Sequence, residues 1–308
     1  MKKQNKNNLA PETIALESKI FGRDGTLLIG ALRFVLPRLN KGSVRDYPEP
    51  YITSLFSRSP EKFIYLYWCE LLGRAYIAAA GSLIRHDQWI KGVLASYQAN
   101  SYLGFCGALR GLLESGADSM YSLEHVAPTI ADNWSALYPI LRDGHGKKIL
   151  LCPELEERLI HFAFARKAHK NEDIPIGHRA LQNRDYIHTI RRFDPAIETL
   201  YCKLVEIIHP AKDSLFWTLK HEESVDHWRV SIGASDDSSK AISRLLDEHQ
   251  ECLTNLLKAA LNYALVTLKL LRKVNVPDID LSFMDGINAD NIKMWRSIEA
   301  KLETNNAV

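Results

Sequence analysis

The feature that most constrains the fold is a long run of helical periodicity near the carboxyl end, which predicts a helix over 238–273. Its apolar residues recur every three or four positions, at Leu253, Leu257, Leu261, Ala264, Leu268 and Leu271. This spacing gathers them into one wide apolar stripe, which is typical of a helix that packs against a core. The run ends in "LLRKVNVP", where the cations and the proline indicate a helix C-terminus.

The remainder of the chain is also patterned mainly as helices. We expect them over 13–39, 60–84, 87–98, 102–123, 129–142, 153–169, 179–192, 195–209 and 288–303. The prolines of 45–54 predict a loop, and 221–239 is polar and irregular, with one short strand at 228–232. Since no strand-rich region, repeat or low-complexity tract is present, the predicted fold class is all-α, an antiparallel helical bundle.

The length of 308 residues allows one large domain or two ordinary ones. No sharp linker divides the sequence. We therefore expect one domain overall, in which residues 1–59 form a loosely attached N-terminal extension of helix and loop and residues 60–308 form the helical bundle domain.

Composition argues against several classes of protein. The net charge of +2 gives no overall electrostatic case for nucleic acid or an anionic membrane, although a local basic patch would not show in that total. The five cysteines are scattered and form no C-x-x-C pair, which favours a reducing, cytoplasmic compartment. Charged residues interrupt both apolar stretches, 62–84 and 253–271, so no membrane span and no membrane partner are expected.

Motifs for metals and cofactors are absent, and none is expected to bind. The glycine-rich "GFCGALRG" lacks the Lys and Ser or Thr of a phosphate-binding loop, and no H-E-x-x-H or G-x-S-x-G is present. The pairs His221/His227 and His161/His169 do not have the i, i+4 spacing that places both imidazoles on one helix face.

The predicted helix 102–123 is unusual for an apolar segment because it contains four glycines and a charge pair. Gly104, Gly107 and Gly111 share a face, and each costs about 1 kcal/mol of helix propensity relative to alanine. That cost suggests the close approach of another backbone along this face. Arg110 and Glu114 lie one turn apart, and the leucines around them favour at least partial burial.

A second segment with potential chemistry is "YCKLVEIIHPAKDS", 201–214. Tyr201 begins an apolar helical stripe, and His209 directly precedes Pro210, which should end the helix there. An imidazole at a helix C-terminus is favoured in its charged form. His209 is therefore a candidate acid–base group or anion ligand near neutral pH.

Together, "ALRGLLESGADSMY" and "YCKLVEIIHPAKDS" resemble a poorly characterised family of bacterial all-helical proteins. That family has an R-x-x-x-E helix and, about a hundred residues later, a Y-x-x-L-x-x-x-x-H helix, and it is distantly similar to HEPN domains. The resemblance covers these two segments and the helical layout of about 60–215. It implies a HEPN-like core with N-terminal and C-terminal helical extensions.

HEPN ribonucleases of toxin–antitoxin and phage-defence systems cleave RNA without metal, using an Arg and a His four to six residues apart on one helix. This chain departs from that motif, because Arg184/His188 have three residues between them. Arg158/His161 and Arg166/His169 have only two. The ribonuclease motif therefore does not carry over.

The residues that match the narrower family are Arg110, Glu114, Tyr201 and His209. We hypothesise that the two helices pack together and bring these four side chains into one polar cluster. In it the guanidinium would hold a phosphate or carboxylate, Glu114 would orient it, and His209 would move a proton.

Two functions remain open from the sequence. The first is a divergent HEPN-like, metal-independent ribonuclease of a bacterial defence or stress system, with RNA as its partner. The alternative is a non-catalytic helical interaction or regulatory protein, a homodimer or the partner of another protein, in which the Arg–Glu–His cluster fixes helix register. The polar stretch 221–239 could be a lid in the first case or a plain connection in either.

Overall fold

The computed structural model describes residues 11–39, 49–146, 148–170, 172–210, 214–215, 217–223, 226, 228–232, 237–276 and 279–306. It is predominantly helical, which confirms the all-α class. The helices are α1 (Pro11–Leu39), α2 (Glu49–Arg58), α3 (Pro60–Gln98), α4 (Tyr102–Leu123), α5 (Val126–Asp132), α6 (Trp134–Asp143), α7 (Pro153–Phe164), α8 (Asn183–Arg191), α9 (Ala196–Ile208), α11 (Asp237–Val274) and α12 (Lys293–Asn306). The short 3-10 helices are η1 (Ile176–His178) and η2 (Ser282–Gly286), and one hairpin pairs β1 (Leu219–Glu223) with β2 (Trp228–Ile232).

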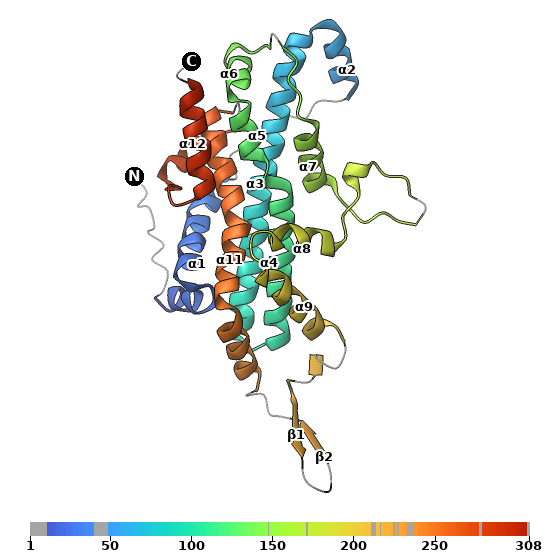
Figure 1. The fold of residues 1–308 in the computed structure, drawn as a ribbon, viewed down its shortest axis with the longest axis vertical. Helices are drawn as coiled ribbons and strands as arrows, with labels where there is room; N and C mark the ends of the chain where they lie inside the picture. Colours follow the sequence, from blue (N-terminus) through green and yellow to red (C-terminus); the bar gives the residue numbers. More distant parts are fainter. Residues whose placement is uncertain are drawn as a thin grey trace.

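Three long helices form the axis of an elongated bundle. Helix α3 runs opposite to α4 and α11, and the three lie side by side (Figure 1). Their facing side chains make one continuous core, in which Trp68, Phe105, Leu109 and Leu257 are completely buried. The predicted apolar stripe of the long C-terminal helix is therefore covered by its own chain.

Helix α1 packs against α11 and α3 and contributes Phe21 and Leu32 to the same core. Gly22 bends this helix, because its φ of +70° lies in the left-handed region, where glycine is favoured. The bend is held by α11, whose Thr254 donates a hydrogen bond of 2.7 Å to the Phe21 carbonyl. Within the predicted extension 1–59, the segment 11–39 is thus packed into the bundle, whereas 1–10 and 40–48 lie outside the described residues.

The predicted break between helices 60–84 and 87–98 is wrong, because α3 continues from Pro60 to Gln98. The residues there are polar, but they lie within the helix next to α4 and do not form a loop. Arg85 pairs with Asp118 of α4 at 2.5 Å, and His86 is completely buried between helices. The Arg85–Asp118 pair thus links α3 to α4 at this point, whereas the ring nitrogens of His86 are buried without a hydrogen-bond partner among the residues that the structure describes.

Several other boundaries also differ from the prediction. The loop expected over 45–54 already becomes helix α2 at Glu49, and α7 ends at Phe164 instead of continuing to 169. Helix α8 begins only at Asn183, where Gln182 and Asp185 form a capping box. The strand predicted at 228–232 is confirmed, and its antiparallel partner 219–223 was not expected.

The predicted backbone approach along Gly104, Gly107 and Gly111 is also wrong. Gly107 faces open space, and Gly111 makes room for the indole of Trp89 instead of a backbone. The close helix approach occurs at Gly116, where an added Cβ would lie 3.2 Å from the Ala260 Cβ of α11. Gly111 therefore allows a side chain of α3 to pack closely, whereas the close approach of a neighbouring helix occurs at a glycine outside the predicted stripe.

The hairpin β1–β2 extends beyond one end of the bundle (Figure 1). Val230 and Ile232 share a face of β2 and are largely exposed. Among the helices built from described residues, none combines the length and apolarity needed to cross a membrane.

Candidate functional site: two polar clusters on the outer face of α4

The outer face of α4 carries half-buried residues of this helix, including Arg110, Glu114 and Tyr121. Helices α7, α8 and α9 pack over this face, whereas α3 and α11 cover the opposite side. Because the outer residues recur three or four positions apart, they form a stripe along the helix. Polar contacts along this stripe attach the three short helices to the bundle.

The first group of contacts, the Glu114 cluster, consists of Arg110, Glu114, Asn183 and Tyr201. Glu114 Oε1 accepts a hydrogen bond of 2.9 Å from Arg110 Nε and one of 2.9 Å from Asn183 Nδ2. The Tyr201 hydroxyl donates a third, at 3.3 Å. The Arg110 guanidinium also lies over the Tyr201 ring, 5.8 Å from its centroid. One carboxylate thus joins α4, α8 and α9.

This cluster is only partly shielded from solvent, since the side chains of Arg110 and Glu114 are 30% and 32% exposed. Burial tends to lower the pKa of Arg110, but the hydrogen bond and charge of Glu114 outweigh it, so that its pKa is raised. The guanidinium is therefore always charged. Solvent screening limits what such a pair contributes to stability, to about 1 kcal/mol or less.

The structure brings together three of the four predicted site residues, Arg110, Glu114 and Tyr201, and leaves His209 apart. His209 ends α9 in extended conformation, as its position before Pro210 predicts, and its side chain is exposed. It lies eight residues beyond Tyr201, a rise of about 12 Å along the helix. Arg110 and His209 consequently do not face one common atom.

A buried link lies farther along the stripe. His161 Nε2 and the Tyr186 hydroxyl are 2.6 Å apart, and both rings pack edge-on against Tyr121. Burial lowers the pKa of His161 and raises the pKa of Tyr186 to about 12. Since His161 is only 4% exposed, this neutral pair joins α7 to α8 and is closed to a substrate.

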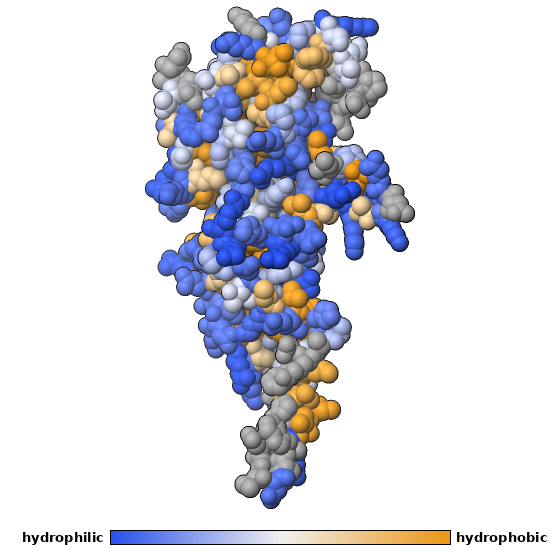
Figure 2. Space-filling model, turned by 45° about the vertical axis from the view of Figure 1, so that its right-hand side comes forward, coloured by the Kyte–Doolittle hydropathy of each residue, from blue (hydrophilic) through white to orange (hydrophobic). Residues whose placement is uncertain are grey.

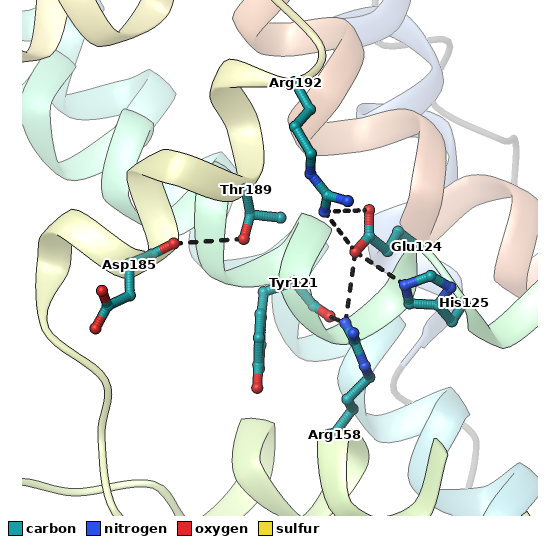
Figure 3. Close-up of polar contacts among 7 residues, drawn as sticks. All are labelled: Tyr121, Glu124, His125, Arg158, Asp185, Thr189 and Arg192. Carbon is teal, nitrogen blue, oxygen red and sulfur yellow. Dashed lines mark hydrogen bonds and ion pairs between the residues drawn. The ribbon is translucent and has the colours of Figure 1, made fainter. Parts of the chain in front are cut away.

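The second group, the Glu124 cluster, consists of Glu124, His125, Arg158 and Arg192 (Figure 3). Arg192 donates hydrogen bonds of 2.8 and 3.0 Å to the two carboxylate oxygens of Glu124. The Arg158 guanidinium approaches the same carboxylate at 3.5 Å and donates to the Tyr121 carbonyl at 2.6 Å. His125 Nε2 lies 3.1 Å from Glu124. The carboxylate is 10% exposed, so that basic groups from three segments converge on one buried anion.

Sequence reasoning missed Asn183 and the whole Glu124 cluster. Glu124 follows the last residue of α4, and its partners come from α7 and from the end of α8, 34 and 68 residues away. No local spacing connects them. Glu124 also lies just beyond the predicted helix 102–123, so helical spacing within that segment gave no signal for it.

A basic surface lies next to these clusters. Segment 166–192 contains seven Lys or Arg residues and three Asp or Glu residues, an excess that the total charge of +2 conceals. Within it, Arg184, His188 and Arg191 are exposed at i, i+4 and i+7 of α8. Arg191 also lies 3.2 Å from Glu198, a surface pair. Figure 2 brings this side of the molecule forward and shows hydrophilic side chains over its middle.

No group of three potential metal ligands occurs in the part of the chain that the structure describes. The described cysteines are all free thiols. Comparison of the chain with protein-family models, with curated proteins and with solved structures finds no match. The features of the molecule that point to a function are therefore the geometry and charge of the two clusters and of α8.

Proposed function

We propose that this protein is a non-catalytic helical interaction protein of the cytoplasm that binds RNA with the exposed face of α8. The observation that carries the proposal is the row Arg184, His188 and Arg191, one turn apart on the outside of a helix, in a segment where Lys and Arg outnumber Asp and Glu by seven to three. Basic side chains at this spacing can follow the phosphates of a nucleic acid strand. Among polyanions, RNA is favoured by the resemblance to HEPN-like proteins.

The two clusters support a structural role for the buried polar groups in this proposal. The oxygen Oε1 of Glu114 already accepts three hydrogen bonds, and Glu124 already has two arginines and a histidine. Groups engaged in this way hold neighbouring helices in register. They fix α8 on α4, so that the basic row is presented on a rigid element.

The second candidate is the divergent HEPN-like ribonuclease of a bacterial defence or stress system. It is favoured by the partial exposure of the Arg110 side chain and the exposure of His209, both of which solvent can reach. Arg110 on α4 and His209 at the end of α9 could contact different phosphates of one strand. If Arg110 holds the phosphate that is cleaved, a group other than His209 would have to transfer the proton there.

The test measures binding of a single-stranded RNA oligonucleotide by fluorescence anisotropy at two salt concentrations. The variant R184A/H188A/R191A should bind about tenfold more weakly or worse. The slope of its log affinity against log salt concentration should also fall by the equivalent of about two phosphate contacts. The matched control is K293A/R296A, which removes two exposed cations from α12 and should leave binding unchanged. Equal loss in both variants, or no binding by the wild type, would contradict the proposal.

The same protein preparations also distinguish the ribonuclease from the non-catalytic RNA-binding protein. RNA is incubated with chelator and examined for cleavage by the wild type, Arg110→Ala and His209→Ala. The interaction proposal expects intact RNA in every case. Cleavage that both substitutions abolish, with unchanged melting temperatures, would establish the ribonuclease instead.

A further inference from the structure

A cavity of about 320 Å³ lies where α4 and α11 begin. Its walls come from α9, the first turns of α4 and α11, and the segment before β1. This volume is at the lower limit of typical small-molecule sites, which span about 300 to 1,000 Å³. It is separate from the exposed face of α8, because it is lined by the part of α9 that faces α11.

One wall of the cavity is aromatic. Tyr102 and Trp217 pack edge-to-face with their ring centroids 5.3 Å apart. The indole is fixed further, since Trp217 Nε1 donates a hydrogen bond of 2.9 Å to the Ser214 carbonyl. Ile207 and Leu245 add aliphatic surface. A flat or aliphatic group of a ligand can therefore be buried here against side chains that are already ordered.

Four charged side chains line the same cavity, two of each sign. Lys203 of α9 and Glu248 of α11 pair with each other across it. The hydrogen bond and charge of Lys203 lower the pKa of Glu248, which keeps this pair ionised. The cation Arg244 and the anion Glu206 remain, and within the described residues neither forms a hydrogen bond or an ion pair.

We propose that this cavity binds a free amino acid with an apolar or aromatic side chain. The side chain would pack on the Tyr102–Trp217 wall, the carboxylate would pair with Arg244, and the ammonium would pair with Glu206. The proposed ligand follows from the charged side chains that line the cavity. A site with one available cation and one available anion beside an apolar wall favours a zwitterion over a molecule with a single charge.

The test is a calorimetric titration with three probes, L-phenylalanine, L-phenylalaninamide and 3-phenylpropanoate. Wild-type protein should prefer phenylalanine by at least about tenfold over each analogue, because each analogue lacks one charge. Glu206→Gln should remove the preference over phenylpropanoate alone. Arg244→Gln should remove the preference over phenylalaninamide alone.

Glu251→Gln is the matched control, since it neutralises an exposed carboxylate of α11 that does not line the cavity, and it should bind like the wild type. Circular dichroism melts establish that each variant is folded. Absence of binding for all three probes would overturn the proposal. Binding with equal affinity by the wild type and both cavity variants would also overturn it, because the ligand would then lie elsewhere.

Discussion

The two faces of α4 are held to the rest of the molecule in different ways. The inner face meets α3 and α11 through completely buried apolar side chains such as Leu109 and Leu112, with Gly116 allowing close approach. The outer face meets α7, α8 and α9 through the Glu114 and Glu124 clusters, whose arginines remain in contact with solvent. One helix thus separates an apolar core from a polar surface.

The difference shows where function can be placed at the smallest cost in stability. Apolar burial contributes most of the favourable free energy of folding, so that the inner face tolerates little change. Partly exposed ion pairs contribute much less, and they can be altered while the fold persists. The helices attached by such pairs, α8 and α9, are also those that carry the basic row and one wall of the cavity.

The largest effect is expected on the inner face. Leu109→Ala should lower the free energy of unfolding by about 2 to 5 kcal/mol, because it removes a completely buried side chain and leaves a cavity. Leu103→Ala on the same helix, where the leucine is 42% exposed, should change it by less than about 1 kcal/mol. Urea denaturation of both variants measures the contrast, and equal losses would show that the two faces are not distinct.

A second difference should appear as the pH is lowered. Burial, with the charge of Arg85 adding to it, lowers the pKa of His86 to about 3, so that the folded protein keeps this imidazole neutral. The unfolded chain takes up its proton below about pH 6.5. The contribution of His86 to stability is therefore complete above pH 6.5 and is lost at about 1.4 kcal/mol per pH unit as the pH falls toward 3.

The measurement compares the stability of wild type and His86→Leu by urea denaturation across this pH range. Both proteins share the titration of all other groups, so the difference in slope isolates His86. The wild type should lose stability more steeply than the variant. Parallel curves would mean that the imidazole gains a proton in the folded state as easily as in the unfolded chain.

Substitution in the Glu124 cluster should have an intermediate effect. Glu124→Gln keeps the shape of a side chain that is 10% exposed but removes the charge that Arg158 and Arg192 share. We expect a loss of about 1 to 2 kcal/mol, since the arginines can regain water. Glu198→Gln, which breaks only the exposed pair with Arg191, should cost less than about 0.5 kcal/mol. Thermal melting monitored at 222 nm compares them, and equal shifts would remove the distinction between a buried and a surface pair.

The smallest effect is expected when either of two glycines of α4 is replaced by alanine. Gly107→Ala should stabilise the protein by up to about 1 kcal/mol, because an added methyl group meets open space and improves helix propensity. At Gly116 the same gain is opposed by the Ala260 Cβ, 3.2 Å from the position of the new Cβ. Gly107→Ala should therefore melt at a higher temperature than Gly116→Ala. The reverse order would show that α11 can move away from α4 freely.

Much of the fold could be predicted because helical periodicity is a local property. The apolar stripe of α11, the end of α9 before Pro210 and the start of α9 after Asp194 all depend on neighbours within a few residues, and Asp194 does accept a hydrogen bond from the Ala196 amide at 2.9 Å. The continuity of α3 could not be predicted in this way. From sequence, its polar residues at 85 and 86 predict a loop, whereas in the structure they lie in a helix that packs against α4.

The sequence by itself determined the all-α class, the Arg110–Glu114 pair and the C-terminal position of His209, because each depends on spacing within one helix. Only the tertiary structure decided that Tyr201 and Asn183 join Glu114, that His209 stays apart, and which glycine meets a neighbouring helix. Those contacts join residues 69 to 87 positions apart in the chain. Their geometry depends on how whole helices pack, a property that no local pattern encodes.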